Sequence, residues 1–186
     1  MEAANRSLKK PDGTVTKEPV IKGKNILISD SAITALNYRV QQEELSSRIY
    51  KAMSMWLNNN GYIGAAKLWL KYSDEELTHS DWAREYLLAM GVQPTTPKLD
   101  APTQNFTGLP EIIQLSYEHE IVVTKQCKQL AADSFKEGDH MLYQLALKYV
   151  KEQVEEHEKM QNWVDRLTAF GEDKLAMRFL DEEMAG

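Results

Sequence analysis

Apolar and polar positions recur with a helical period over most of this chain, and short polar or glycine-containing breaks separate the periodic segments. Ser29 or Asp30 can cap the start of the first periodic segment, and Pro110 is favoured in the first turn of the third. The pattern predicts an all-α chain with four long helices and a short fifth one, at about residues 29–59, 62–90, 110–137, 139–170 and 172–184.

The lengths of the connections restrict how these helices can pack. Helices of about 30 residues are about 45 Å long, and the first and third connections contain only a few residues. The helices on either side of each short connection must therefore be antiparallel neighbours. The second connection, residues 92–109, contains three prolines and can span roughly 60 Å when extended. We therefore predict a four-helix bundle with one long crossover between helices two and three.

Charge is distributed unevenly along the chain. Residues 1–28 carry a net charge of +3, so residues 29–186 carry −9 of an overall charge of −6. An acidic body repels nucleic acid and attracts cations. The basic segment could contact phosphate or an acidic partner, but its Pro, Gly and Lys content favours a solvated tail. The predicted organisation is an N-terminal extension, a bundle and a short C-terminal helix, at residues 1–28, 29–170 and 171–186.

Cysteine content and hydropathy restrict the compartment. Cys127 is the only cysteine, so no internal disulfide can form, which is typical of a reducing cytosol. The chain has no apolar run of 18 or more residues, and its N-terminus lacks the hydrophobic segment of a signal peptide. We therefore expect a cytoplasmic protein without a membrane or nucleic-acid partner.

Acidic side chains interrupt the apolar stripe of every long predicted helix near its midpoint. Glu76 and His79 lie one turn apart on one face of the second helix. Several buried carboxylates cannot all stay ionised unless a cation neutralises them. The pattern therefore indicates a metal site inside the bundle, and a set with one histidine suits iron better than structural zinc. The other three helices offer carboxylates at matching depth: Glu43, Glu120, and the group Glu152, Glu155 and Glu156.

A solvated alternative exists for each of these residues taken alone. Residues 151–159 could form a salt-bridged outer face, and Glu76 with His79 could be a surface pair. The coincidence of acids on four helices makes one shared cavity the better interpretation. Three histidines fall off the inward stripes and are not expected to bind metal: His119, His140 and His157.

Short segments in all four long helices occur together and are distinctive as a set. They are Leu36-Asn37 through Glu43 and Ser46-Ser47 in the first, Gly64-Ala65-Ala66-Lys67 and Glu75-Glu76-Leu77-Thr78-His79 in the second, Tyr117-Glu118-His119-Glu120 in the third, and Tyr149-Val150-Lys151-Glu152-Gln153-Val154-Glu155-Glu156 in the fourth. By these segments, residues from about 30 to 184 resemble a non-haem bacterial-type ferritin of the ferritin-like di-iron family. The resemblance implies a ferritin-like four-helix bundle with a short C-terminal fifth helix.

The resemblance also implies the ligands of a di-iron centre. The first iron would be held by Glu43, Glu76 and His79. Glu76 would bridge to a second iron, whose coordination would be completed by Glu120 and Glu156.

Three further roles are implied by the same resemblance. Gln153 would lie near the second iron as a hydrogen-bonding group or weak ligand. Tyr50 matches the tyrosine beside the dinuclear centre, where it would supply an electron or a hydrogen bond during oxygen reduction. Glu156 would move between the second iron and a third iron site, which would be formed by Glu75, Glu152 and Glu155.

The function implied by the resemblance is that of a ferroxidase that stores iron. Two Fe(II) ions would bind, O2 or H2O2 would take electrons from both, and the ferric product would pass to a mineral inside a homo-oligomeric cage. Such cages contain two dozen subunits in similar ferritins. Iron would be the only metal, and no haem is expected.

Two related functions remain as alternatives. The first is a ferritin-like di-iron peroxidase or oxidase without mineral storage. The second is a bacterioferritin-like haem-binding cage, which would need a Glu-x-x-His in helix four, where Glu152-x-x-Glu155 stands, and a haem-ligating Met where Leu77 follows Glu76. The chain also departs from typical bacterial ferritins by its long N-terminal extension and by Lys148, which stands where many members have a Trp beside the centre.

Overall fold

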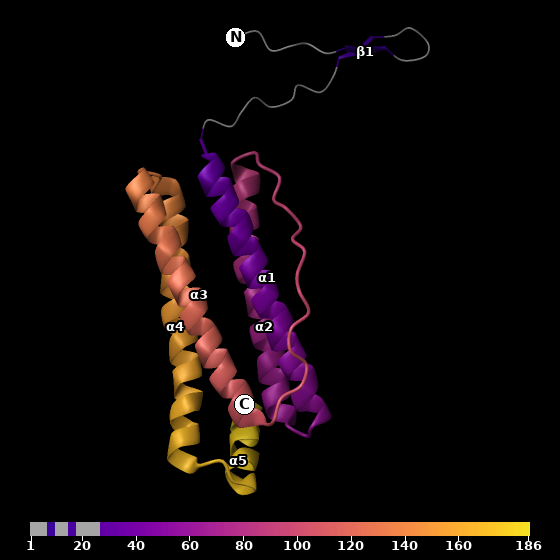
Figure 1. Ribbon diagram of the computed structural model, residues 1–186, viewed down its shortest axis with the longest axis vertical. Helices are drawn as coiled ribbons and strands as arrows, with labels where there is room; N and C mark the ends of the chain where they lie inside the picture. The colour runs from indigo at the N-terminus through magenta and orange to yellow at the C-terminus, as the bar shows by residue number, and fades with distance from the viewer. Residues whose placement is uncertain (1–6, 10–14, 18–26) are drawn as a thin grey trace.

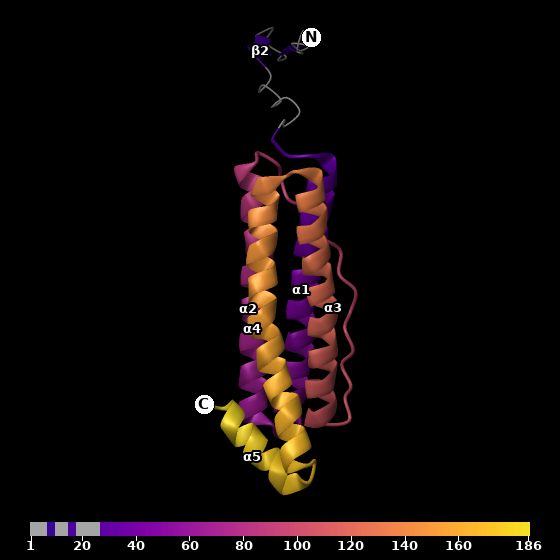
Figure 2. The same cartoon turned by 90° about the vertical axis from the view of Figure 1, so that its left-hand side faces the viewer.

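The protein is a bundle of four long helices with a fifth, short helix across one end (Figures 1 and 2). The computed structural model describes residues 7–9, 15–17 and 27–186. Every predicted helix is confirmed, and each boundary lies within two residues of its expected position. The helices are α1 Asp30–Asn59, α2 Ile63–Ala89, α3 Leu109–Glu137, α4 His140–Phe170 and α5 Lys174–Met184.

The helix ends follow the local chemistry of the sequence. The Ser29 side chain accepts a hydrogen bond from the backbone N–H of Ala32 at 3.1 Å and caps α1. Asp139 caps α4 in the same way, through the N–H of Leu142 at 2.9 Å. Gly138, between α3 and α4, adopts a left-handed conformation with φ of 71°, which favours glycine. Gly138 and Asp139 together end α3 and begin α4, which keeps that connection short.

The predicted long crossover is confirmed. Figure 1 shows the segment between α2 and α3 running along the outside of the bundle from one end to the other. Thr95 donates hydrogen bonds from its N–H and its hydroxyl to the Asn37 side chain of α1, at 2.8 and 3.0 Å. Phe106 packs edge-on against Trp56 near the far end of the crossover. Because of the crossover, α3 begins at the end of the bundle opposite to the end of α2. Helix α3 then forms an antiparallel pair with α4, as α1 does with α2.

The apolar core is divided into two clusters along the bundle. One is built around Trp69 and Met160, and the other around Leu36 and Leu87. Each long helix contributes to both clusters, and between its two contributions it carries buried polar side chains. These are Glu43, Ser46 and Ser47 on α1, Ser73, Glu76, His79 and Ser80 on α2, Ser116 and Glu120 on α3, and Gln153 and Glu156 on α4. The polar layer therefore lies at the midpoint of the bundle, with apolar packing on both sides.

The fifth helix is held against the start of α2. Met177, Leu180 and Met184 are buried in the cluster around Trp69. The Asp181 carboxylate accepts a hydrogen bond from the backbone N–H of Ala65 at 2.8 Å. At the preceding residue, a Cβ atom on Gly64 would lie 1.9 Å from the backbone oxygen of Asp181. Glycine is therefore required where the two helices approach most closely.

We expect Gly64→Ala to destabilise the protein by about 1–3 kcal/mol, because the added methyl group forces α5 away from α2. Urea unfolding followed by circular dichroism measures the change. Lys67→Ala, at an exposed position one turn along α2, is the control and should leave stability nearly unchanged. Equal stability of Gly64→Ala and the original protein would show that α5 is not tightly docked.

Two short strands form part of the N-terminal extension. Strands β1 Ser7–Lys9 and β2 Val15–Lys17 pair antiparallel, with Ser7 opposite Lys17. The pattern of residues 1–28 predicts no strand, so these strands are an addition from the structure. The remainder of residues 1–26 lies outside the described residues, so the prediction of a solvated basic tail is untested. Among the described residues, no helix is long and apolar enough to cross a membrane.

Candidate metal centre

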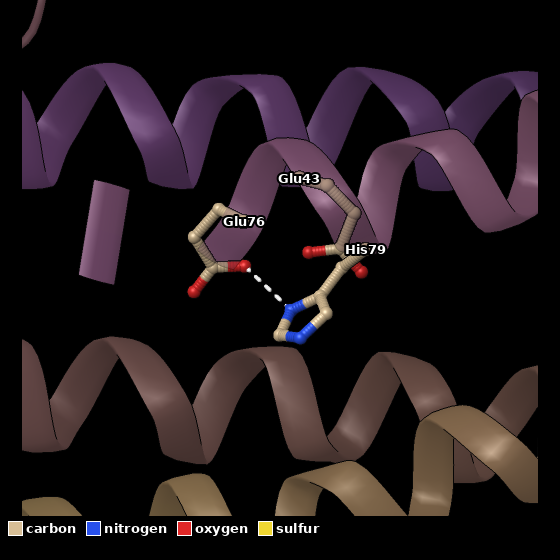
Figure 3. Close-up of side chains that lie close together, drawn as sticks. All are labelled: Glu43, Glu76 and His79. Atoms are coloured by element: carbon tan, nitrogen blue, oxygen red, sulfur yellow. Dashed lines mark hydrogen bonds and ion pairs between the residues drawn. The ribbon is translucent and has the colours of Figure 1, made fainter. Parts of the chain in front are cut away.

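Three of the predicted ligands meet in the middle of the bundle. Glu43 comes from α1, and Glu76 and His79 come from α2. Figure 3 shows the three side chains pointing toward one another, with Nδ1 of His79 3.2 Å from Oε2 of Glu76. Each is at most 5 % exposed, and each offers a ligand atom within 4.8 Å of the others. The structure thus brings together the residues predicted to hold the first iron.

A second group of donors shares His79 with the first. Its members are His79, Glu152 and Glu156, again with ligand atoms within 4.8 Å of one another. The Nε2 atom of His79 lies 3.6 Å from Oε1 of Glu152. The imidazole therefore stands between carboxylates of α2 and α4. Glu152, which the resemblance assigns to a third iron site, lies beside His79 in the structure.

Glu120 and Tyr50 form a buried pair on the α1–α3 side of the centre. The Tyr50 hydroxyl donates a hydrogen bond to Oε1 of Glu120, and both side chains are nearly inaccessible to solvent. Oε2 of Glu120 and Oε2 of Glu43 are buried without a hydrogen-bond partner among the described residues. Such unpaired buried oxygens are unfavourable in a protein interior. They fit a site whose missing partner is a cation.

Gln153 is buried and faces the same centre. It accepts a hydrogen bond from the Thr124 hydroxyl through Oε1 at 2.7 Å. That bond leaves the amide N–H2 group free to donate toward Glu120, whose pKa is raised by burial and lowered by Tyr50 and, least, by Gln153. Gln153 is therefore placed as a hydrogen-bonding group beside the predicted second iron position.

Burial and mutual repulsion make the central carboxylates hard to ionise. Burial raises the pKa of Glu76 well above its ordinary value, and neighbouring carboxylates, led by Glu43 and Glu120, raise it further. Burial is also the main cause that raises the pKa of Glu120 to about 7. The pKa of Glu156 is raised by burial and lowered in part by Lys159. Without a metal ion, Glu76 and Glu120 therefore favour their protonated forms more than exposed carboxyl groups do.

Two cations at the edge of the cluster were not found by the sequence analysis. Nε of Arg39 lies 2.8 Å from Oε1 of Glu43, and both side chains are buried. Nζ of Lys159 lies 2.9 Å from Oε1 of Glu156 and 3.2 Å from Oε2 of Glu75. In the sequence, these two ion pairs are indicated by helical spacing, because Arg39 precedes Glu43 by four residues and Lys159 follows Glu156 by three. Such pairs are usually solvated, so the spacing alone does not show that they are buried.

The remaining acids of the predicted third iron site are not gathered in this structure. Glu75 is half-buried and pairs with Lys159, and Glu155 is exposed. Neither belongs to the two clusters of close donor atoms found among the described residues. The third site stays a prediction, which would require these side chains to move together when metal binds.

His119 lies in the α1–α3 interface, so its expected placement off the inward stripes is wrong. Its Nε2 is 2.7 Å from the Ser46 hydroxyl, and its ring meets the ring of Tyr50 edge-on. Burial, with a smaller effect from Arg39, lowers the pKa of His119 to about 4, so it is neutral at pH 7. It belongs to neither donor cluster. His140 and His157 are exposed, as expected.

Lys148 is exposed, and the Trp82 ring lies between it and the centre. Its Nζ lies 3.5 Å from the centroid of the Trp82 ring, and that ring is 4.7 Å from the ring of His79. A tryptophan is therefore present beside the centre, supplied by α2 and covered by a cation.

The order of the helices, the crossover and the midpoint cluster agree with a comparison to known families. The sequence pattern of the family described as "Ferritin-like domain" matches residues 33–170.

The chain belongs to the ferritin family.

Similar ferritins match nearly the whole bundle. A probable bacterial non-heme ferritin-like protein of Haemophilus influenzae is 29 % identical over 158 residues, which are 85 % of this chain and 96 % of that protein. A bacterial non-heme ferritin of Escherichia coli O6:H1 is 28 % identical over 159 residues, covering 86 % and 96 %. A solved open pore ferritin of the archaeon Archaeoglobus fulgidus superimposes with a TM-score of 0.83 at 29 % identity, covering 86 % and 97 %.

The ferritin comparison confirms the family resemblance and the fold inferred from the segments in helices α1 to α4. The matched ferritin domain, residues 33–170, contains nearly all of the four long helices and ends where α4 ends. Helix α5 and the N-terminal extension lie outside it. The donor cluster lies wholly within the ferritin domain.

Proposed function

We propose that this ferritin-family chain binds Fe(II) as a substrate at the midpoint cluster, oxidises it to Fe(III), and stores the product in a cage built from copies of itself. The observation that carries the proposal is the set of buried carboxylates contributed by all four long helices, two of which have unpaired buried oxygens. A closed protein interior tolerates that concentration of negative charge when cations bind there. The family and the names of similar ferritins support iron as the cation.

The proposed ligands of the first ion form one donor cluster, and those of the second ion are the neighbouring buried carboxylates. Glu43, Glu76 and His79 would hold the first Fe(II), since their ligand atoms already converge. Glu76 would also contact the second ion, together with Glu120 and Glu156. Because the pKa values of Glu76 and Glu120 are raised, iron binding would release protons from them near neutral pH. Gln153 would add a neutral hydrogen-bonding group there, and a third ion would take Glu75, Glu152 and Glu155.

The proposed reaction needs two metal ions close together. Each Fe(II) gives up one electron, and the two electrons together reduce O2 to H2O2 or H2O2 to water. The chain supplies the ligand geometry, excludes bulk water and takes up or releases protons at Glu120. Tyr50 holds Glu120 through its hydroxyl group and is within reach of the centre as a hydrogen-bond donor or an electron donor.

Exposed apolar side chains support assembly into a cage. Met55, Val122 and Val154 are each at least half exposed, although they lie on the long helices of the bundle. A soluble monomer gains little from such side chains, whereas they are buried in a homo-oligomer. We propose a shell of two dozen subunits in the cytoplasm, as the resemblance to bacterial ferritins implies.

Iron loading of the native particle tests the proposed function. The purified protein is mixed with Fe(II) in air, and the mass and iron content of the particle are measured after free iron is removed. We expect a large homo-oligomer that retains far more iron per chain than the midpoint clusters can ligate. A small species with only a few iron ions per chain would instead indicate a di-iron oxidase without storage. A Soret band in the purified protein would indicate a haem-binding cage.

A further inference from the structure

Arg39 is a buried arginine in direct contact with a proposed iron ligand. It is 2 % exposed, and its Nε lies 2.8 Å from Oε1 of Glu43, one helical turn later. Its Nη1 donates to Oε1 of Gln126 at 2.9 Å and lies 3.8 Å from Sγ of Cys127. The Nε–Glu43 contact is an ion pair, and among the described residues neither Nε nor Nη2 has a hydrogen-bond partner. The guanidinium is thus fixed by groups on α1 and α3 at the edge of the cluster.

The charge of this guanidinium is permanent. Burial works against the charged form, but nearby acidic groups, led by Glu43, outweigh it and raise the pKa of Arg39 above its ordinary value. An arginine does not lose its proton under these conditions. The contact takes one oxygen of the Glu43 carboxylate and leaves the other, Oε2, buried and unpaired. The Glu43 carboxylate points toward Glu76 and His79 in Figure 3.

We propose that Arg39 is a positioning residue that makes the affinity of the iron site depend on the charge of the bound ion. It holds Glu43 through one oxygen, so that Oε2 is presented to the metal ion. At the same time its positive charge repels a bound trivalent ion more than a divalent one, which favours departure of the ferric product after oxidation. This inference rests on the proposed function and assigns to Arg39 a role in product release.

The physical basis is the dependence of electrostatic energy on ionic charge. At a fixed distance, the repulsion between Arg39 and a bound ion is proportional to the charge of that ion. Oxidation of Fe(II) adds one positive charge to each ion and adds no new carboxylate. The free energy of repulsion from Arg39 therefore rises by about half at the moment of oxidation. A neutral side chain at this position would remove that difference.

The test measures binding of two redox-inert ions, Mn2+ and Tb3+, to the whole assembled protein. Two neutral variants are compared, Arg39→Gln and Arg39→Met, so that the result does not depend on one side chain fitting the core. Arg39→Lys keeps the charge but loses the planar guanidinium that contacts Glu43 and Gln126. Arg48→Gln, an exposed arginine on the same helix, is the matched control. Circular dichroism checks helicity in each, and binding that persists in Glu76→Ala is subtracted to isolate the central cluster.

In the neutral variants, we expect the ratio of Tb3+ affinity to Mn2+ affinity to rise by roughly threefold or more. If Mn2+ binds roughly tenfold more tightly, Tb3+ should bind roughly thirtyfold more tightly, because the effect scales with ionic charge. Arg39→Lys and Arg48→Gln should keep the original ratio. A purely structural role for Arg39 would weaken both ions alike, and the lysine variant would not restore binding.

Two results would overturn the inference, and they are distinguishable. An unchanged affinity ratio in both neutral variants, with binding still lost in Glu76→Ala, would remove the role of Arg39 and leave the proposed function intact. Ion binding that is the same in Glu76→Ala and in the original chain would show that the cluster is not a metal site. In that case both the inference and the proposed function fail.

Discussion

Replacing Glu76 by alanine is expected to abolish rapid Fe(II) oxidation while leaving helix content unchanged. Glu76 is the carboxylate that both proposed iron positions share, and its side chain lies among Glu43, Glu120 and Glu156. Loss of an outer-shell partner of a metal ligand typically costs roughly 10–100-fold in metal affinity or activity, so loss of a shared ligand should cost at least roughly 100-fold. Stopped-flow absorbance after mixing with Fe(II) measures the rate.

The fold should survive this change for an electrostatic reason. In the metal-free protein, burial and then the neighbouring carboxylates raise the pKa of Glu76, so a charged Glu76 is unfavourable there. Replacing it by alanine removes this unfavourable term and offsets the loss of packing. Glu85→Ala, an exposed acid on the same helix, is the matched control and should oxidise Fe(II) at the original rate. Oxidation kinetics of Glu76→Ala equal to those of the control would contradict the proposed site.

The stability of the metal-free protein is expected to fall as pH rises from about 4.5 to about 7. The pKa of Glu120 is about 7 in the folded protein, against an ordinary value of 4.5. Between these two pH values the folded protein keeps a proton on Glu120 that the unfolded chain has lost. Raising the pH therefore favours unfolding. This one carboxyl accounts for about 3 kcal/mol at 1.36 kcal/mol for each pH unit. Glu76, whose pKa is also raised, contributes with the same sign.

Metal binding should have the opposite pH dependence, because the ion binds the deprotonated carboxylates. The difference in melting temperature between Mn2+-loaded and metal-free protein should therefore widen from pH 5 to pH 8. Differential scanning calorimetry with Mn2+ or with a chelator measures both curves. In the metal-free protein, Glu120→Gln should remove about 3 kcal/mol of the expected fall in unfolding free energy across that pH range. A metal-free protein that becomes more stable as pH rises would show that these carboxylates are ionised without a cation.

Much of the architecture follows from local sequence. Ser29, Asp139 and Gly138 set helix ends through capping and a left-handed turn, which are interactions between residues a few positions apart. The prolines of residues 92–109 exclude a continuous helix, and the length of that segment requires a crossover. The inward position of Glu43, Glu76 and Glu120 also follows from helical period, because each interrupts an apolar stripe.

The contacts within the centre depend on packing between helices. Period shows which face of a helix is buried, but it does not give the rotation and axial shift between facing helices. The resemblance to bacterial ferritins assigns Glu152 to a third iron site, and the structure places it 3.6 Å from His79. His119 is expected to fall off the inward stripes, and it is half-buried against Ser46 and Tyr50.

The sequence by itself determined the five helices, the crossover and the acidic layer at the midpoint, because all three depend on local propensity and helical period. Only the tertiary structure decided that the Arg39–Glu43 pair is buried, since a pair four residues apart on a helix is solvated unless another helix covers it. Helix α3 provides that cover through Gln126 and Cys127. Burial then makes an ordinary helical ion pair a fixed charge beside a metal site, because no solvent is present to screen it.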